Sequence, residues 1–595
     1  MPTRFMRQLL PAALVLLVLA SADSGRAADY YVAPTGSDAN PGTLERPFLT
    51  IEKARDTVRL LAPAMNADIV VHLRGGVYPL SKTIVFGPPD SGHNGHKVVY
   101  QAQEQEKPVL SGMRTITGWT VHDAAKGIYQ APAGNLDFRQ IYLDGALATR
   151  ARFPNVQSAT DLGPYLWMVN ADDKSKRYCI AKADWNTAAD ATNKAVLELV
   201  VHVHWIHHTV RFASAVPQGN LVWITPQLPE RDVAFNKPVT FYQKCSYFWQ
   251  NAYEFIDADG EWFRDPVGQK LYCKLPPAAT GKVVCEVPSI DTLIEIIGTA
   301  ATPVHDLEFR GLTLEGSNWT NPSQRGLVAT QFAQPYNAKR SYENPDYPPG
   351  MIRAAHAQRI AFRHNVIWRA GATGIQFWAN VDDSDIEANY FSDIAANAIE
   401  IDVHAAKNPP PEMQSSNIAI WNNDFRRAGC VYSNGGAILA HFVQGLIVEH
   451  NEISDMPYSG MQIGDQPGAY APCGCTGNKI RFNHVHHTNR QHDDGGGIYT
   501  LGGQQQDSEI VGNYIHDVRR SAWTQNFAVM GIYLDNKTQF VKVAHNVIEQ
   551  CTGSIGQLNK SKDNAIFANN PKDPAKRAAI IKNAGIKPGY SPRQP

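Results

Sequence analysis

The sequence has few cysteines, almost no net charge and only one long apolar run. Eight cysteines in 595 residues are too few for a fold held together by disulfides. Lys and Arg number 55 against 56 Asp and Glu, so the chain lacks the basic excess with which nucleic-acid-binding proteins offset phosphate charge. These absences indicate a large folded protein with no nucleic-acid partner, acting on something uncharged or mildly charged.

The single long apolar run lies at the N-terminus. It extends from Leu9 to Leu19, follows Arg4 and Arg7, and precedes the small residues Ala20-Ser21-Ala22. The run is shorter than the ~20 residues that a membrane-spanning helix needs. This order of a basic, an apolar and a small-residue region predicts a signal peptide over residues 1–22, cleaved near Ala22 or Ala28. We therefore expect an exported protein, periplasmic or secreted, with no membrane span after cleavage.

A short phrase, Asn followed by any residue and then Ile, Val or Phe, returns through the second half of the chain. It begins at Asn365, Asn389, Asn423, Asn451, Asn483, Asn513 and Asn546, at intervals of 24, 34, 28, 32, 30 and 33 residues. The surrounding residues alternate between apolar and polar, which is typical of strands. The repeat predicts an all-β fold, a right-handed parallel β-helix, in which each Asn occupies a turn, tolerates left-handed backbone geometry and pairs with the Asn one coil away. A β-propeller is the alternative, but it would need four antiparallel strands per repeat and a steadier period.

The remaining segments suggest how this coil is completed. We expect an N-terminal cap and first coils over 29–112, with a capping helix carrying Ile51, Ala54, Val58 and Leu61 at helical spacing. Residues 113–290 lack the Asn phrase and predict an inserted β-sandwich-like module. The main β-helix spans 291–570, and a C-terminal cap over 571–595 begins with a helix at Asp573-Pro574. In the inserted module, His202, His204, His207 and His208 fit core packing better than zinc, because they alternate along a strand with no aspartate nearby.

Strand alternation in the repeats assigns one outward-facing stripe of polar and aromatic residues. In Gly531-Ile-Tyr-Leu-Asp535, the Ile and Leu face inward, so Tyr533 and Asp535 face outward. The same rule places these further residues on the stripe: Gln376, Trp378, Glu400, Asp402, His441, Gln462 and Tyr499. Rings stack on sugar faces, while acids and amides bond hydroxyls, so the stripe predicts a carbohydrate groove. A plain solvated face would instead carry Lys and Thr.

The phrase His492-Asp-Asp-Gly-Gly-Gly-Ile-Tyr499 brings acids to the mouth of one strand, with three glycines that would let the backbone approach a ligand. Asp494 and Asp535 fall in consecutive coils and are the candidate catalytic pair. Glycoside hydrolysis needs two carboxyl groups, one that protonates the leaving oxygen and one that acts as nucleophile or base. His492 and Asp493 are neighbouring substrate-binding candidates, and Asp465, close to Gln462, is another.

Three features together resemble the β-helical glycoside hydrolases of family 141. They are the Asp494–Tyr499 and Gly531–Asp535 phrases, the opening Tyr31-Val-Ala-Pro-Thr-Gly-Ser-Asp38, and the inserted strand module. The resemblance implies fucosidase or xylanase activity on a plant cell-wall or related polysaccharide. It places the family's two catalytic aspartates on Asp494 and Asp535, with a one-residue ambiguity at Asp493. It also implies a monomer that needs an oligo- or polysaccharide substrate and no metal or other cofactor.

Two further functions stay open on the sequence. A polysaccharide lyase on the same fold would need a base and a cation such as Ca²⁺ to neutralise a uronate. His441 or His492, with Glu400, Asp402 and Asp465, would then serve those roles. A non-catalytic glycan-binding protein is the third possibility, and it would retain glycan without cleaving it.

Overall fold

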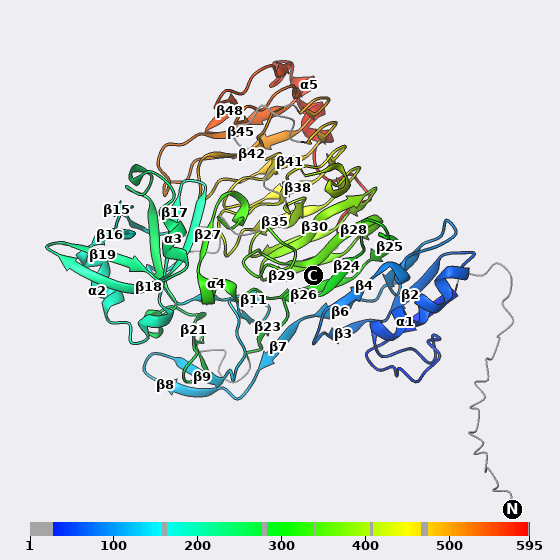
Figure 1. Cartoon of the computed structure of the whole chain (residues 1–595), viewed down its shortest axis with the longest axis horizontal. Coiled ribbons are helices and arrows are strands. Elements are labelled where there is room, and N and C mark those ends of the chain that lie inside the picture. Colours follow the sequence, from blue (N-terminus) through cyan, green and yellow to red (C-terminus); the bar gives the residue numbers. More distant parts are fainter. Residues whose placement is uncertain are drawn as a thin grey trace, which may run out of the picture.

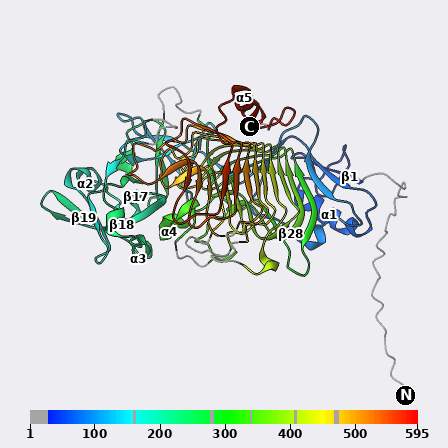
Figure 2. The same cartoon turned by 90° about the horizontal axis from the view of Figure 1, so that it is seen from above.

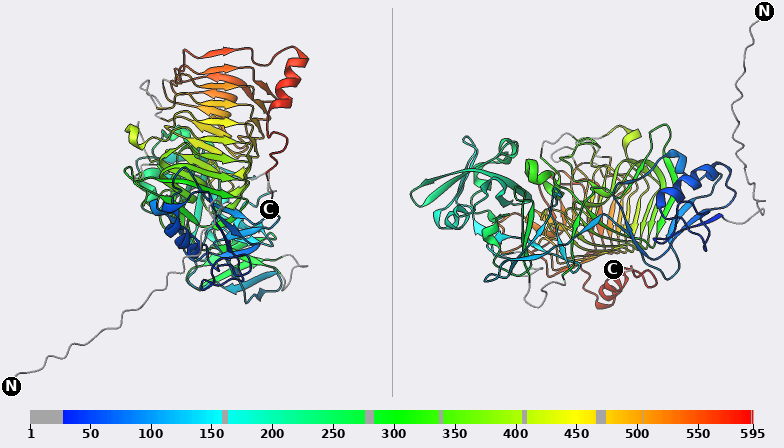
Figure 3. Two further views of the ribbon diagram at one scale, coloured as in Figure 1. Left: turned by 90° about the vertical axis from the view of Figure 1, so that its right-hand side faces the viewer. Right: turned by 90° about the horizontal axis from the view of Figure 1, so that it is seen from below.

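The computed structural model describes residues 28–157, 163–275, 283–336, 340–404, 409–465, 474–503, 505–592 and 594. The predicted signal peptide and Cys473 lie outside these residues. The described chain forms a tall coil with a smaller module on one side (Figure 1). The coils stack on one another along its length (Figures 2 and 3).

Three rows of parallel strands build the coil, which confirms the predicted parallel β-helix. The first row contains β4 (Ile84–Phe86), β24 (Ile294–Ile297), β28 (Gly350–Arg363), β30 (Thr373–Asp382), β33 (Ile399–Ile401), β36 (Ile438–Ala440), β39 (Met461–Ile463), β42 (Gly495–Thr500), β45 (Val529–Leu534) and β48 (Gly553–Gln557). The second contains β1 (Ala28–Val32), β2 (Ile69–Leu73), β5 (Val98–Ala102), β25 (Val304–Arg310), the end of β28, β31 (Asp385–Glu387), β34 (Ala419–Trp421), β37 (Ile447–Glu449), β40 (Lys479–Arg481), β43 (Glu509–Val511), β46 (Lys542–Ala544) and β49 (Ala565–Phe567). The third contains β3 (Gly76–Pro79), β6 (Pro108–Ser111), β26 (Thr313–Ser317), β29 (Val366–Ala370), β32 (Tyr390–Ile394), β35 (Asp424–Ala428), β38 (Glu452–Ser454), β41 (His484–His486), β44 (Tyr514–His516) and β47 (Val547–Glu549).

Apolar side chains fill the interior of the coil in register. In the first row, each inward residue stacks on its counterpart in the next coil: Ile375, Ile399, Ile438, Met461, Ile498 and Ile532. All of them are buried in one continuous core. Burial of apolar surface contributes about 25 cal/mol per Å², so this stack stabilises every interface between coils.

The inserted module interrupts the coil without breaking its registers. β6 pairs with β26, and β5 with β25, although the module separates them in the sequence. Three small sheets form the module. One contains β7 (Met113–Ile116), β10 (Tyr142–Leu143), β11 (Ala146–Leu147) and β23 (Cys285–Pro288); the next contains β8 (Thr120–Asp123), β9 (Ile128–Pro132), β12 (Thr149–Arg150), β21 (Glu261–Asp265) and β22 (Lys270–Lys274). The largest contains β13 (Arg152–Phe153), β14 (Leu166–Trp167), β15 (Asn170–Asp172), β16 (Arg177–Ala181), β17 (Glu198–Val203), β18 (Ile206–Gln218), β19 (Leu221–Pro226), β20 (Ser246–Gln250) and β27 (Leu327–Ala329).

Short helices and one shared strand complete the module. The helices α2 (Lys182–Ala189) and α3 (Glu230–Ala234) belong to it, and α4 (Asn321–Arg325) precedes β27. β27 comes from the coil and pairs with β18 of the module. The largest sheet of the module is therefore joined to the coil by backbone hydrogen bonds.

Helices flank the two ends of the coil. α1 (Ile51–Leu61) is capped by Thr50 and buries Ile51, Ala54 and Val58, while Leu61 is 40% exposed. α5 (Pro574–Asn583) starts at the predicted Asp573 cap. It lies beside the last coils rather than across their open end (Figure 3). This position differs from the predicted C-terminal cap, because the chain after α5 returns along the coil, where Gly585 N–H donates to the Phe482 carbonyl.

The described cysteines form no disulfide, and the described helices include no membrane-spanning segment. Cys179, Cys245, Cys273, Cys285, Cys430, Cys475 and Cys551 are all free thiols. Within the described ranges, no helix is long and apolar enough to cross a bilayer.

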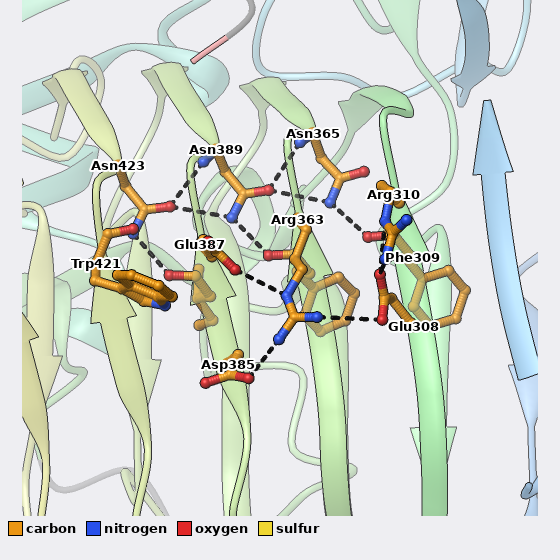
Figure 4. A network of polar contacts seen from close by, with 12 residues as sticks. Glu308, Phe309, Arg310, Arg363, Asn365, Asp385, Glu387, Asn389, Trp421 and Asn423 are labelled. Carbon is orange, nitrogen blue, oxygen red and sulfur yellow. Dashed lines mark hydrogen bonds and ion pairs between the residues drawn. The ribbon is translucent and has the colours of Figure 1, made fainter. Parts of the chain in front are cut away.

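The repeated asparagines form a continuous ladder along one turn of the coil (Figure 4). Asn365, Asn389 and Asn423 show the pattern: backbone N–H and side-chain Nδ2 of one asparagine both donate to Oδ1 of the next, at 2.8–3.0 Å. The ladder continues to Asn569, one step beyond the last predicted member. The predicted pairing is therefore confirmed. The left-handed residue, however, is the one before each asparagine, such as His364 at φ 55°.

The ladder makes a large, local contribution to stability. Replacing Asn483 by alanine leaves the buried N–H of Asn451 without its acceptor and removes the side-chain bond from Asn483 Nδ2 to Asn513. Each buried polar group left unpaired costs about 1–3 kcal/mol, so we expect the free energy of unfolding to fall by about 2–4 kcal/mol. Urea denaturation followed by circular dichroism measures this change. Asn220→Ala in an exposed turn is the control, and an equal loss in both variants would contradict the ladder's role.

Candidate active site

The outward residues of the first row lie in register, as the alternation predicts. Glu400 pairs with Gln376 on one side and Leu439 on the other, and the line continues through Gln462 and Tyr499 to Tyr533. The two ends of this stripe differ in their surroundings. At the Gln376 end other segments cover the side chains, whereas the Tyr533 end adjoins a partly exposed carboxyl group.

Glu400 lies at the covered end and has no exposed surface. Its carboxylate accepts hydrogen bonds from Gln334, Thr373, Gln376 and Asn397. Burial raises its pKa. Gln376 also donates to the Pro348 carbonyl, so Gln334 and Pro348 cover this end of the stripe. This corrects the prediction that Glu400 and Gln376 line an open groove.

Asp402 and Trp378 are enclosed in a similar way. Asp402 accepts from the backbone N–H and the hydroxyl of Ser415 at 2.8 and 2.6 Å, and burial raises its pKa to about 7. The ring of Trp378 packs edge-on against Tyr342 and Tyr347. These contacts assign both predicted binding residues to packing, because Ser415 bonds the Asp402 carboxylate and the two tyrosines pack against the Trp378 ring.

A second polar group lies midway along the stripe. Arg340, His441 and Asp465 contact one another, with 3.5 Å between His441 Nδ1 and an Asp465 oxygen. Burial and the Arg340 charge hold the pKa of His441 well below its usual value, so the ring is neutral. Gln462 is also buried, and its Oε1 has no partner among the described residues.

The structure brings the two candidate catalytic aspartates into one hydrogen-bonded group with two tyrosines. Asp535 directly follows β45 and accepts a bond of 2.6 Å from the Tyr499 hydroxyl. Its oxygens also accept from Asn536 Nδ2 at 3.0 Å and Asn559 Nδ2 at 2.5 Å. In the adjacent coil, Asp494 accepts a bond of 3.0 Å from the Tyr533 hydroxyl. Each aspartate is thus positioned by a tyrosine of the outward stripe.

Asp494 differs from Asp535 in exposure and in proton affinity. Asp535 is 1% exposed, whereas Asp494 is partly exposed. Burial, and after it the negative charge of Asp535, raise the pKa of Asp494 to about 7. A carboxyl with this pKa is protonated in a large fraction of molecules near neutral pH, which a general acid requires.

The three glycines after Asp494 allow close packing between coils. A Cβ on Gly495 would lie 2.4 Å from Ser459 Oγ, and one on Gly496 would lie 2.8 Å from the Met530 carbonyl oxygen. Neighbouring coils, and not a ligand, therefore account for the glycine run. This corrects the reason expected from the sequence.

Asp493 and His492 face the inserted module, not the Asp494–Asp535 pair. Asp493 is fully buried and contacts His204 Nδ1 at 3.1 Å, and it accepts from the Phe527 N–H. His492 Nδ1 lies 2.6 Å from the His204 carbonyl oxygen. Both predicted binding residues thus hold the module against the coil. In this arrangement Asp494, and not Asp493, is the partner of Asp535.

The module and the coil together supply residues that the sequence did not single out. Trp205, Phe241 and Phe527 pack together next to His204, with ring centroids 5.5–5.9 Å apart, and all three are partly exposed. Lys237 Nζ lies 5.0 Å from the Trp205 ring. Burial lowers its pKa, and the charge of Asp494 offsets only part of that shift. Nothing in the local sequence marks these residues, because they reach the site only through the docking of the module.

Among the described residues, two groups that contain histidines have the spacing of metal ligands. His202, His207 and His492 are buried with nitrogens within 4.8 Å of one another, and Glu452, His484 and His486 form a similar group on the third row. In the first group the Ser433 hydroxyl already bonds His207 Nδ1 and His492 Nε2. Burial holds the pKa of His202 and His207 well below the usual value, so these rings are neutral. His202, His207 and His492 form part of the packed boundary between the module and the coil.

Comparison with known proteins places the module in a family. Residues 127–276 match the model of the GH141 insertion domain. The chain carries a GH141 insertion domain. A solved glycoside hydrolase matches 95% of this chain over 100% of its own length, with a TM-score of 0.84 and 24% identity. The match over residues 127–276 confirms the resemblance to family 141 in this domain. The similarity to the solved structure, which covers 95% of the chain, confirms the β-helical fold.

Two other solved structures match at lower similarity. A structure of XylC with xylose matches 92% of this chain and 86% of its own, at 13% identity and a TM-score of 0.46. A rhamnogalacturonan lyase matches 94% of this chain and 87% of its own, at 11% identity and a TM-score of 0.38. No curated protein has a significant sequence match to this chain.

Proposed function

We propose that the protein is a glycoside hydrolase in which Asp494 and Asp535 act together on a glycosidic bond. The observation that carries this proposal is the pair of aspartates in adjacent coils, held by Tyr533 and Tyr499, with one carboxyl partly exposed. The GH141 insertion domain docked beside the pair supports the same activity. The arrangement provides both groups that glycoside hydrolysis requires.

The surroundings of the two carboxyl groups divide the roles between them. Asp494, with its pKa of about 7, protonates the leaving oxygen. Asp535 accepts three hydrogen bonds from neutral donors, an arrangement that suits an ionised carboxylate, and it acts as nucleophile or base. Tyr499 and Tyr533 orient the two groups.

The proposed substrate is a plant cell-wall or related polysaccharide, cleaved in a fucosidase-like or xylanase-like reaction after export of the protein. The partly exposed rings of Trp205, Phe241 and Phe527 supply apolar surface on which a sugar ring can stack. The reaction needs no metal in this scheme, because both proton transfers use carboxyl groups.

A panel of aryl glycosides and cell-wall polysaccharides tests the activity directly. Hydrolysis yields a new reducing end and no unsaturated sugar. An ultraviolet-absorbing unsaturated product that disappears on chelation would instead show a lyase. Glu400 and Asp402 do not favour the lyase reaction, since both carboxylates already accept hydrogen bonds from neighbouring side chains.

The rate should fall on the alkaline side of neutrality. Asp494 must carry a proton to act as an acid, and its pKa is raised to about 7. As the pH rises through this value, the protonated fraction falls about tenfold per pH unit, and kcat should fall in proportion. Initial rates at constant ionic strength between pH 5 and 9, with melting temperatures over the same range, measure this limb. A kcat that stays constant to pH 9 would contradict the acid role of Asp494.

A further inference from the structure

A cavity lies between the inserted module and the coil, separate from the aspartate pair. Its volume is about 300 Å³. The module contributes Arg139, Gln140, Arg150 and Arg152 to its lining, and the coil contributes Arg427 and Arg490. No residue of the Asp494–Asp535 group lines it. Five guanidinium groups around one small space are a strong concentration of positive charge.

Three of these arginines are neutralised outside the cavity or at its edge. Arg139 forms two hydrogen bonds with buried Glu198, at 2.8 and 3.0 Å. Arg427 pairs with Asp393 at 3.0 Å, and Arg490 pairs with Asp455 at 2.7 Å. Asp455 is the one carboxylate among the cavity's lining residues. No acid among the described lining residues forms an ion pair with Arg150.

The Arg150 guanidinium contacts neutral groups. It donates to the carbonyl oxygens of Phe138 and Arg139 and lies 4.6 Å from the Trp262 ring. It forms no ion pair with any residue that the structure describes. Burial, and after it the Arg139 charge, lower the pKa of Arg150 to about 10. A bound anion would relieve both effects.

Gln140 provides an independent sign of a ligand. Its side chain is buried, with 2% exposure, and lines the cavity. Neither its Oε1 nor its Nε2 has a hydrogen-bond partner within the described part of the chain. Leaving a buried polar group unpaired costs about 1–3 kcal/mol, so two such atoms on a residue that lines the cavity indicate a missing partner.

We propose that this cavity binds a small oxyanion, a carboxylate, sulfate or phosphate group, between Arg150 and Gln140. Guanidinium forks bind such groups through paired N–H···O bonds, and the Gln140 amide bonds a neighbouring hydroxyl or oxyanion oxygen. The chemistry fits a uronic-acid sugar and a free inorganic anion alike. Because both the module and the coil line the cavity, the bound anion ties the two together.

Calorimetric titration of the Asp535→Asn full-length protein tests the site without turnover of a sugar. The probes are sulfate, phosphate and a galacturonic-acid disaccharide, with a galactose disaccharide as the neutral control, all at equal ionic strength. We expect the anions to bind and the neutral sugar not to bind at this site. Competition between sulfate and the uronate would identify a uronate as an occupant, whereas binding of the inorganic ions alone would assign the site to a free oxyanion.

Variants of the arginines make the assignment specific. Arg150→Gln should weaken anion binding at least tenfold, the equivalent of about 1.4 kcal/mol, and Arg427→Gln at the partly exposed edge should weaken it severalfold. Arg519→Gln, at an exposed arginine outside the cavity, is the matched control and should bind as the parent does. If Arg150→Gln does not fold, Arg427→Gln decides the result. No binding by the parent protein, or equal binding by the parent, the Arg427 variant and the control, would overturn the proposal.

Discussion

Replacing Asp535 by asparagine is expected to lower kcat by about 10²–10⁴-fold with little change in stability. The carboxylate of Asp535 accepts from Tyr499, Asn536 and Asn559, and an amide in its place carries no charge with which to attack or to activate water. The amide has the same shape, so the buried hydroxyl of Tyr499 keeps an acceptor. Rates on the best substrate of the glycoside panel, with melting temperatures, measure the effect.

A control for this variant lies on the same part of the coil. Asp563→Asn alters a partly exposed aspartate whose neighbour is Gln539, away from the tyrosines, and should leave kcat unchanged. If Asp535→Asn retains the parent rate while folding normally, Asp535 has no part in the chemistry. If instead both variants lose activity equally, the loss is structural.

The coil could be predicted from the sequence because its determinants are local and repeated. Asn389, Asn423 and their counterparts recur at each turn, and the same side-chain bonds recur with them. The alternation of apolar residues likewise fixed which side chains enter the core, as Ile399 and Ile532 do. Asp494 and Asp535 could be proposed as a pair for the same reason, since each sits at a defined position in its own coil.

The accessibility of the stripe could not be predicted, because it depends on segments outside the repeat. Glu400 and Trp378 face outward as the alternation requires, yet Gln334 bonds the Glu400 carboxylate and Tyr347 packs against the Trp378 ring. The roles of His492 and Asp493 depend on His204, which is almost 300 residues away in the chain and reaches them only when the module docks. A pattern along one strand gives a side chain's direction, and tertiary packing decides whether that side chain meets solvent.

Asp494→Asn should separate the two proposed roles. We expect a loss of about 10²–10⁴-fold on substrates with poor leaving groups, because the amide can still accept from the Tyr533 hydroxyl but cannot donate a proton to the leaving oxygen in the way a carboxyl can. A leaving group that departs without a proton, such as dinitrophenolate, does not need this acid. On a dinitrophenyl glycoside, this variant should therefore release dinitrophenolate at most of the parent rate.

The comparison with Asp535→Asn makes this result decisive. An activated leaving group does not replace the missing nucleophile or base, so Asp535→Asn should stay inactive on the dinitrophenyl substrate. The rate of Asp494→Asn on that substrate should also lose its fall above pH 7, since the group with the pKa of about 7 is gone. Equal recovery in both variants, or in neither, would contradict the division of roles. Recovery in Asp535→Asn alone would reverse it, because Asp535 would then be the proton donor and Asp494 the nucleophile or base.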